Sequence, residues 1–524
     1  MNVAPIDWVI LGTLFLGLLV LAIWINSQCK SVADYLVSGR KVRLWLGIGA
    51  GIAGEVGLVS IAAMCEQGYM RGFGFVLIGL IAMCITVPVF GIFGIGIERF
   101  RATKAMSVPQ YVEMRYSRRL RLLTGMFNSL AGVLQMCIFP IVGASFLRVL
   151  MAAPEYASIA GQEIPTEWLI MGVLLGCAVL FTYFGGYITL TVTNFVQMIV
   201  IMVAVYWVLS YIVADLGLQN LWTTLEQERG NAAFYPFADG DSSYGWQWFA
   251  WMMAMTILLQ FSYGPYLQKY ASLDKPKTVS RSYLISTLFG NGRTYVIIGL
   301  GVCALVGLGT SPPQGLATSD QQWMAMATPY YLSQVTPPIV LGLLLAGLLF
   351  ADISTTDQYL LSWSTSIVND CVCPLLSRPL EPKTHIMAVR LTIVVLCILF
   401  FIVGVFYEPT LPIWEFMWLL ANIIGGTGIA VLFGMYWKRA STVGAYGAVL
   451  VSLVLPLLDL ALRWFYVARE WDDYPLKPQE TGLYTYVLAT ITLIVLSLSS
   501  RQPTGYWDLG EEVRKMNARE ASNQ

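Results

Sequence analysis

The sequence predicts an all-α, polytopic membrane protein with thirteen transmembrane helices. Of its 524 residues, 57% are apolar and only 12% are charged, whereas soluble proteins average about 25% charged residues. Apolar stretches of roughly 20 residues, long enough to cross about 30 Å of hydrocarbon, recur along the chain. Lysine and arginine gather in alternate loops between these stretches, as they do when those loops face the cytoplasm.

The composition also excludes several classes of partner and chemistry. Thirty-one basic and thirty-one acidic residues leave no net charge, so no basic surface for nucleic acid is expected. The nine cysteines lie mostly in apolar runs, where they are typical of small buried hydrophobes and not of disulfides or zinc sites. With His385 as the single histidine and no HExxH pair, a membrane-embedded enzyme is not expected.

The thirteen predicted spans are spread over the chain from residue 6 to residue 500. They begin near residues 6, 44, 73, 120, 167, 194, 246, 282, 336, 388, 412, 441 and 482. The first, Ile6–Asn26, lacks a positive leader and a small-residue cleavage site, so we expect a retained helix with the N-terminus outside. The predicted cytoplasmic loops and C-terminal tail hold 24 of the 31 Lys and Arg residues, against five on the other side. This places the C-terminus in the cytoplasm.

Two predicted spans contain helix breakers at their centres. The second span contains Gly51–Gly57 and the seventh contains Phe261–Pro265. The two lie five crossings apart and therefore enter the membrane in opposite directions. Interrupted spans at matching places in two halves predict an inverted-repeat transporter, because unwound backbone is tolerated only where it lines a cavity. The alternative is that the glycines merely allow close helix packing, which Pro265 and the matching placement disfavour.

Three carboxylates are predicted to lie within the spans. They are Glu55, Asp352 and Asp357, and each costs roughly 2.5 to 3.5 kcal/mol at mid-membrane. Arg293 is the only cation predicted to lie as deep. Either protons or a bound hard cation such as sodium would then neutralise the excess negative charge. The alternative is a structural role in hydrogen bonding between helices.

The ninth span contains the densest polar pattern, from Phe350 to Tyr359. At 100° per residue, Asp352 and Asp357 flank a single polar stripe. That stripe consists of Ala351, Ser354, Thr355 and Gln358. Its hydroxyls either hydrogen-bond to carbonyls of their own helix or, together with the broken segment Ala53–Gly57, form a cation site.

Several motifs resemble those of the sodium:solute symporter family, which includes sodium-coupled transporters of glucose, proline, sialic acid and pantothenate. The ninth span with its Ser354-Thr355 pair is the most specific match. The others are Ala33–Arg40, Thr182–Tyr187 and Gly434–Arg439 followed by Gly444. The resemblance covers residues 30 to 450 in the expected order.

This resemblance implies a LeuT-type fold of five plus five helices that works by alternating access. Residues 6–26 would form an extra N-terminal helix, 44–215 the first inverted repeat and 246–437 the second. Two C-terminal helices at 441–500 and a cytoplasmic tail at 501–524 would complete the single transmembrane domain.

The resemblance also implies a sodium site between the second and ninth spans. Its ligands would be the carbonyl oxygens of Ala53, Val56 and Ala351 and the hydroxyls of Ser354 and Thr355. Glu55 falls where the proline-transporting branch has an acidic residue important for coupling, and Asp352 is a second candidate coupling carboxylate.

One position departs from the family pattern. Members with a second sodium site carry an aspartate in a Thr-Asp-x-x-Gln run, whereas this chain has Asn194 within Thr193–Gln197. Two hydroxyl positions of that second site are occupied here by Asp357 and Gln358. We hypothesise that the carboxylate has moved to Asp357, so that Asp357, Gln358 and Asn194 hold a second cation or a proton.

The solute site is the least determined part of the prediction. Polar and aromatic candidates beside the broken segments are Gln135, Gln260, Tyr263, Asn291, Arg293 and Asn422. The guanidinium of Arg293 would either clamp a solute carboxylate bidentately or neutralise a buried acid, and the second role is slightly favoured.

The predicted function is sodium-coupled import of a small polar organic solute, namely a sugar, an amino acid or an organic acid. Proton coupling, a transporter-like membrane sensor and a passive channel are the alternatives; the sensor would need a long soluble output region, which the chain lacks. One or two sodium ions and no organic cofactor are expected. The absence of any Asn-x-Ser/Thr sequence favours a bacterial plasma membrane.

Overall fold

The computed structural model describes most of the chain. The described residues are 2–26, 38–54, 56–159, 161–237, 244–312, 320–376, 380–407, 411–469 and 474–500. Glu55, residues 33–37 of the first motif and the predicted tail at 501–524 lie outside these ranges.

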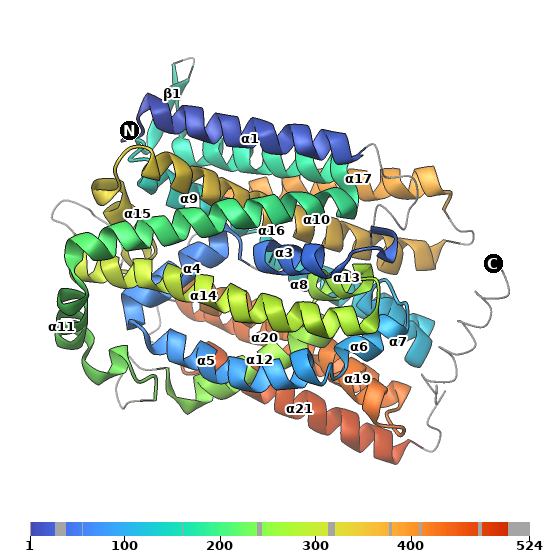
Figure 1. Ribbon diagram of the computed structural model, residues 1–524. Coiled ribbons are helices and arrows are strands. Elements are labelled where there is room, and N and C mark those ends of the chain that lie inside the picture. Colours follow the sequence, from blue (N-terminus) through green and yellow to red (C-terminus); the bar gives the residue numbers. More distant parts are fainter. Residues whose placement is uncertain are drawn as a thin grey trace.

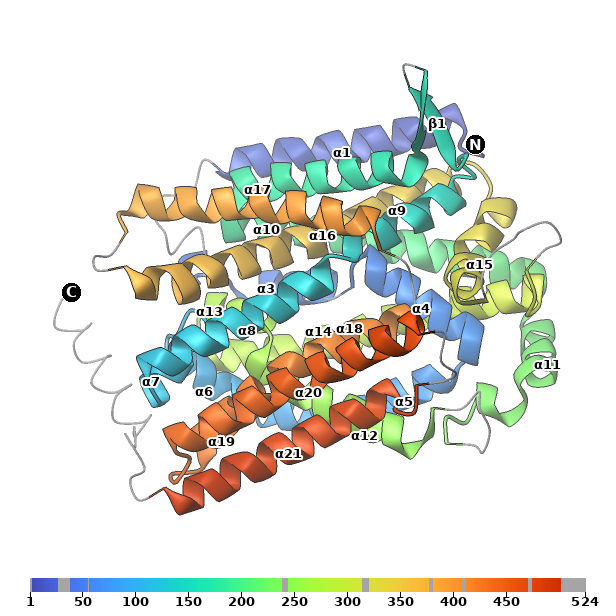
Figure 2. The same ribbon diagram turned by 180° about the vertical axis from the view of Figure 1, so that it is seen from behind.

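The described residues form a bundle of helices that run along a common direction (Figures 1 and 2). The first half contains α1 (Pro5–Asn26), η1 (Ser38–Arg40), α3 (Leu44–Gly54), α4 (Leu58–Arg71), α5 (Gly74–Thr86), η2 (Val87–Ile92), α6 (Ile97–Ala102), α7 (Val108–Arg115), α8 (Arg118–Met136), α9 (Phe139–Leu150), α10 (Thr166–Leu216), α11 (Leu218–Arg229) and η3 (Gly230–Ala233). The second half contains α12 (Gly245–Ser262), α13 (Gly264–Ser272), α14 (Pro276–Leu308), α15 (Asp320–Val335), α16 (Val340–Ser366), η4 (Ile367–Val372), η5 (Cys373–Leu375), α17 (Pro382–Val405), α18 (Ile413–Ala421), η6 (Asn422–Ile424), α19 (Gly425–Tyr436), α20 (Thr442–Ala468) and α21 (Pro478–Ser499).

One β-hairpin interrupts the helical chain between α9 and α10. Strands β1 (Tyr156–Ile159) and β2 (Gln162–Pro165) pair antiparallel, with Tyr156 opposite Pro165. Gly161, with φ 81°, precedes β2, and this conformation is accessible to glycine at little cost. The hairpin lies with α15 at the end of the bundle where α1 begins (Figure 1).

Among the described residues, ten helices are long and apolar enough to cross a membrane, and the bent pair α3–α4 makes up to eleven. The other predicted spans correspond to Thr166–Thr182, the shorter apolar part of α10, and to α12, which has 18 residues. Large apolar side chains on the outer helices are exposed, among them Leu16 and Val20 on α1 and Ile491 and Val495 on α21. An apolar surface of this kind suits lipid and not water.

Both predicted helix breaks are present. Helix α3 ends at Gly54 and α4 begins at Leu58, at an angle of 58°. In the second break α12 ends at Ser262, Tyr263 is extended with φ −80° and ψ 113°, and α13 begins at Gly264. Pro265 lies in the first turn of α13, where the missing N–H removes no helix hydrogen bond.

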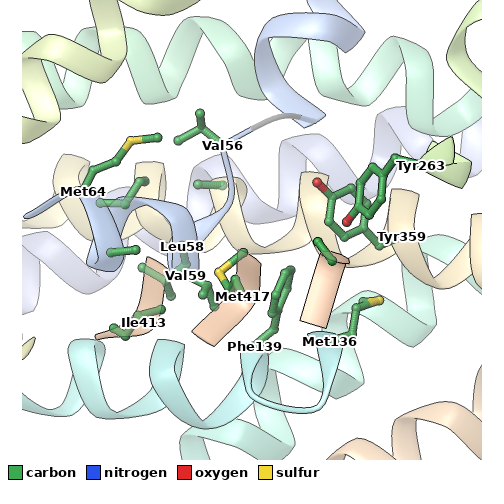
Figure 3. Packing of buried hydrophobic residues seen from close by; sticks show 14 of the residues in the cluster. Val56, Leu58, Val59, Met64, Met136, Phe139, Tyr263, Tyr359, Ile413 and Met417 are labelled. Carbon is green, nitrogen blue, oxygen red and sulfur yellow. The ribbon is translucent and has the colours of Figure 1, made fainter. Parts of the chain in front are cut away.

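Helix α16 runs through the interior of the bundle, and all but two of its residues are buried. It packs against α10, α1 and α3. The apolar core continues beside the first break, where α4, with Leu58 and Val59, packs against α9 and α18, which carry Phe139 and Met417 (Figure 3). The buried polar residues of α16 therefore lie beside the break between α3 and α4, where backbone carbonyl and N–H groups lack partners within their helices.

Candidate functional site

The polar stripe of α16 meets the end of α3. The Ser354 hydroxyl lies 3.2 Å from the carbonyl oxygen of Ala53 and 3.0 Å from that of Ala351 in its own helix. All three residues are fully buried. Ala53 lies in the last turn of α3, whose carbonyls have no partners within the helix. Three of the five predicted sodium ligands thus lie together.

Thr355 faces the other side of the same break. A Cβ atom placed on Gly57 would lie 2.7 Å from the Cβ of Thr355 and 2.8 Å from its Oγ1. The Thr355 hydroxyl is buried and has no hydrogen-bond partner within the described part of the chain. Val56, buried at 4% exposure, precedes the N-cap Gly57, so it lies outside the hydrogen-bond ladder of α4.

Gln358, the last residue of the polar stripe, contacts the end of α3. A Cβ atom on Gly54 would lie 1.8 Å from the side-chain oxygen of Gln358. This amide oxygen is also buried, and the described residues offer it no hydrogen bond. Oxygen atoms of Ser354, Thr355 and Gln358 therefore line the contact between α16 and the broken helix, and hard cations prefer such oxygen ligands.

Asp357 adds a charged group on α16. The residue is fully buried, and neither of its carboxylate oxygens has a hydrogen-bond partner among the described residues. Helix α10 packs along α16. On α10, the side-chain oxygen of Asn194 and both polar atoms of the Gln197 amide are buried and form no hydrogen bond with the described residues. Buried polar atoms are normally paired, so each of these side chains is a candidate for contact with an additional bound group.

The described side chains do not form a transition-metal site. Within the described ranges, no group of three or more His, Cys, Asp or Glu side chains is placed to hold a metal ion. The available ligands are carbonyl, hydroxyl, amide and carboxylate oxygens, which suit an alkali or alkaline-earth ion better than a transition metal.

Two buried cations lie at the C-terminal end of α3. Arg293 of α14, with 1% exposure, donates a hydrogen bond from Nη1 to the carbonyl oxygen of Ile52. Lys269 of α13 is buried at 2% exposure, and its Nζ is 2.9 Å from where a Cβ on Gly51 would lie. Cations are favourable at a helix C-terminus. The prediction that Arg293 is the only deep cation is wrong, because α13 continues after the break and carries Lys269 inward.

A cavity of about 230 Å³ opens beside the first break. It lies between Val56 and side chains of α5, α12, α13, α14 and α18. Of the predicted solute residues, Gln260, Asn291 and Arg293 line it. Trp414 and Trp418 of α18 also line it, and sequence reasoning missed them because periodicity alone does not say which helix face meets the cavity.

The other three predicted solute residues connect helices to one another. The Tyr263 hydroxyl donates to the side-chain oxygen of Gln135 at 3.1 Å, and the Gln135 amide donates to the carbonyl of Met417 at 3.3 Å. The side-chain oxygen of Asn422 accepts hydrogen bonds from the indole of Trp251, at 3.0 Å, and from the hydroxyl of Tyr486. These residues are not among those that line the cavity.

Sequence reasoning also missed Glu66, which lies on α4 near a predicted span end. Its carboxylate is buried and accepts hydrogen bonds from the Gln321 amide at 2.7 Å and from the backbone N–H of Ile413 at 2.9 Å. Close by, Arg71 of α4 pairs with Glu415 of α18 at 3.2 Å. These contacts hold α4 to α15 and α18.

Comparisons with known proteins agree with this architecture. The profile of the sodium:solute symporter family matches residues 35–452. The chain is 22% identical over 508 residues to the osmoregulated proline transporter OpuE of Bacillus subtilis, covering 94% of both proteins. It is 22% identical over 470 residues to the sodium/sialic acid symporter SiaT of Proteus mirabilis, covering 86% of this chain and 89% of that protein.

The fold also matches a solved structure. The substrate-bound, outward-open state of a sodium-coupled sialic acid symporter superposes with a TM-score of 0.78 at 17% identity. The match covers 96% of this chain and all of the other. The similarity establishes a shared helical membrane fold.

Proposed function

This chain belongs to the sodium:solute symporter family and is a sodium-coupled solute symporter, not an enzyme; on that premise, we propose how it binds its ions and solute. The solute would be a small polar organic molecule, such as a sugar, an amino acid or an organic acid. Gln260, Asn291 and Arg293 would contact it in the cavity beside the first break.

We propose thirteen membrane crossings arranged as two inverted repeats of five. The repeats comprise residues 44–215 and 246–437, with α1 before them and α20 and α21 after them. If it were straight, the 51-residue helix α10 would be about 76 Å long, more than twice the hydrocarbon thickness. We therefore count its two apolar parts, Thr166–Thr182 and Tyr187–Leu216, as two crossings. The breaks of α3–α4 and α12–α13, one in each repeat, support the arrangement.

The proposed sodium site lies between the first break and α16. Its ligands are the carbonyl oxygens of Ala53, Val56 and Ala351 and the hydroxyls of Ser354 and Thr355. The observation that carries this assignment is the buried Thr355 hydroxyl without a partner beside Gly57, together with Ser354 at 3.2 Å from the carbonyl of Ala53. A sodium ion coordinated by these oxygens would replace the hydrogen bonds to water that the oxygens lose on burial.

This placement gives a mechanism for release. The ion holds two separate segments together, because α3 and α16 each supply part of its shell. When α16 moves away from the break during the change of access, the shell opens and the ion leaves. Glu55 and Asp352 would act as coupling carboxylates. At a membrane potential of 100 mV, each sodium ion that enters supplies about 2.3 kcal/mol for solute accumulation.

We propose a second ion site around Asp357, Gln358 and Asn194. The support is Asp357 itself, whose two oxygens are buried without hydrogen bonds in the described residues. An ionised carboxylate in this position is costly unless a cation accompanies it. Either a second sodium ion or a proton would neutralise the carboxylate. Because a proton would suffice, proton coupling is kept as the alternative function.

The decisive experiment is sodium-driven uptake with Thr355→Ala. Removal of the hydroxyl takes one ligand from the ion, so we expect half-maximal uptake at a sodium concentration about tenfold higher, or about 1.4 kcal/mol. Proteoliposomes with an imposed sodium gradient and labelled sugars, amino acids and carboxylates provide the measurement. Uptake that is indifferent to the gradient in the parent protein would contradict sodium coupling.

Thr365→Ala is the matched control. Thr365 lies on the same helix, is buried, and likewise has a hydroxyl without a partner in the described residues. Because it lies almost three turns from Thr355, we expect the control to keep the sodium dependence of the parent. Equal sodium dependence in Thr355→Ala and Thr365→Ala would refute the assigned ligands.

A further inference from the structure

An open apolar groove lies on the surface of the bundle between α19, α21 and the connection from η2 to α6. Its volume is about 660 Å³. Apolar and aromatic side chains line it, namely Ile95, Leu432, Phe433, Tyr436, Trp437 and Ile494. The groove shares no lining residue with the cavity beside the first break, so the two are separate sites.

Hydrogen bonds and a ring contact hold the walls of the groove together. The backbone N–H of Gly96 donates to the hydroxyl of Tyr436 at 2.7 Å. Arg99 of α6 donates from Nη1 to the carbonyl of Met435 at 3.1 Å, and its guanidinium lies 4.3 Å from the centre of the Tyr436 ring. Helix α19 also packs against α21. The groove is therefore preformed, because its three walls are joined to one another.

The groove lies where two membrane spans end. Tyr436 is the last residue of the span that begins at Ile413. Ile494 precedes the end of α21 at Ser499 by five residues, or about 7.5 Å of helix. Tryptophan and tyrosine are enriched at this level, where hydrocarbon meets the lipid headgroups. The apolar part of the groove therefore faces hydrocarbon, while Tyr436 and Trp437 lie near the headgroups.

The rim of the groove is positively charged. Arg99 is exposed, and so are Lys438 and Arg439, the two residues that follow the groove wall at Trp437. Within five positions of these cations in the sequence, the acidic residue is Glu98. Its carboxylate pairs with Lys277 of α14 at 3.2 Å, so it is already matched by another cation. The headgroup end of the groove thus favours a negatively charged ligand.

We propose that this groove binds an anionic phospholipid. One acyl chain lies against Phe433 and Ile494, and the phosphate lies at Arg99 and Arg439, because guanidinium groups bind phosphate through charge-assisted hydrogen bonds. An apolar groove accepts any acyl chain, so the cationic rim is the feature that selects a lipid with a net negative charge. This end of the bundle is predicted to face the cytoplasm, where the membrane leaflet carries anionic lipids.

The first test compares two lipids that differ in the charge of the headgroup. Purified, delipidated protein in detergent is titrated with dioleoylphosphatidylglycerol or dioleoylphosphatidylcholine, and native mass spectrometry counts the bound molecules. We expect the first phosphatidylglycerol to bind about tenfold more tightly than phosphatidylcholine. Glycerol 3-phosphate supplies the headgroup without acyl chains, and we expect it not to bind at the same concentrations.

Three results of this titration would overturn the proposal. Equal affinities for the two lipids would show that the rim does not select charge. Glycerol 3-phosphate binding as tightly as phosphatidylglycerol would show that the groove is not needed. A dimer that forms in place of the lipid complex would assign the groove to a second copy of the chain.

The second test removes charge from the rim. For Arg439→Gln we expect the preference for phosphatidylglycerol to fall about threefold, as for an exposed ion pair, and to vanish when Arg99→Gln is added. Lys383→Gln is the matched control. Lys383 is exposed at the start of α17, at the same end of the bundle (Figure 2) but on a helix that packs against α10 and α16. An equal preference in Arg439→Gln and Lys383→Gln would contradict the assigned rim.

The third test fills the groove without changing its charge. Ile494→Trp places a larger ring where the acyl chain would lie, and we expect phosphatidylglycerol to bind about tenfold more weakly. Val487→Trp is the control, because Val487 is exposed on the same helix, about two turns from Ile494, and does not line the groove. Unchanged binding in Ile494→Trp would contradict the groove as the site. The titration of the parent protein tests the proposal even if a variant fails to fold.

Discussion

Among the individual residues, Gly54 and Gly57 determine how closely α16 approaches the first break. A Cβ on Gly54 would collide with the side chain of Gln358, and one on Gly57 would collide with Thr355. Gly57 has φ −83°, which any residue adopts, so the requirement there is for space and not for conformation. The absence of two side chains allows the hydroxyl groups of α16 to approach the backbone of the break closely, as the proposed sodium site requires.

At the level of single residues, substitution of Asp357 tests the proposed second ion site. Asp357→Asn keeps the shape of the side chain and removes its charge, so a second ion would lose its main ligand. We expect a changed Hill coefficient for sodium or a changed pH dependence of uptake. Both are measured by initial uptake rates over a series of sodium concentrations at several pH values.

Asp459→Asn is the control for Asp357→Asn. Asp459 is a buried aspartate on α20 that pairs with Arg463, outside the proposed ion sites. An unaltered Hill coefficient and pH profile in Asp357→Asn would refute the second ion site. A matching change in both variants would indicate a general effect of losing a buried carboxylate.

Among the elements, α1 holds the beginning of α16. Asp7 of α1 is fully buried, and its Oδ1 accepts the backbone N–H groups of Ile339, at 2.7 Å, and Gly342, at 3.0 Å. These donors lie at the N-terminus of α16, where a negative charge is favourable. A helix outside the proposed repeats thus positions the helix that supplies most of the proposed sodium ligands.

The prediction for this contact compares two substitutions of Asp7. Asp7→Ala leaves the N–H groups at the start of α16 without an acceptor, and we expect stability to fall by about 1 to 2 kcal/mol. Asp7→Asn retains a side-chain oxygen acceptor, so a smaller loss is expected. Thermal unfolding of the purified protein measures both. Equal midpoints for Asp7→Ala and the parent would show that the contact does not stabilise α16.

Over the whole molecule, polar contacts join the helices at both ends of the bundle. At one end, Glu66 and Arg71 hold α4 to α15 and α18 through Gln321, Ile413 and Glu415. A transporter that works by alternating access has to open each end in turn. Opening at this end requires the contacts of α4 to separate.

The opposite end carries its own set of contacts. Arg101 of α6 donates to the carbonyl of Leu273, after α13, at 2.6 Å. Arg121 of α8 pairs at 3.0 Å with the buried Asp370, which follows α16. Because these contacts reach the C-terminal ends of α13 and α16, opening at this end would also disturb the helix that supplies most of the proposed sodium ligands.

For the whole molecule, we predict that the two termini lie on opposite sides of the membrane. In the described residues α1 begins at one end of the bundle and α21 ends at the other (Figure 1), as an odd number of crossings requires. We expect a cysteine tag at the N-terminus to react with an impermeant maleimide on intact cells, and the same tag at the C-terminus to react only after permeabilisation. Reaction of both tags from the same side would contradict thirteen crossings.

Much of this architecture follows from local sequence. Span positions follow from apolar length, the breaks at Gly54 and Tyr263 follow from glycine and proline placement, and the stripe of Ser354 and Thr355 follows from helical periodicity. Each of these depends on residues close together in the chain. The family resemblance then connected the stripe with the break near Ala53, which periodicity alone does not do.

Tertiary packing determined the rest. Lys269 is expected in a loop and is buried against Gly51, and Arg293 contacts the carbonyl of Ile52. Asn422 binds Trp251 and Tyr486 and does not line the cavity. These outcomes depend on which face of one helix meets which face of another. The sequence by itself determines that a helix has a polar face, because periodicity is local, but the neighbour of that face is set by contacts between segments hundreds of residues apart.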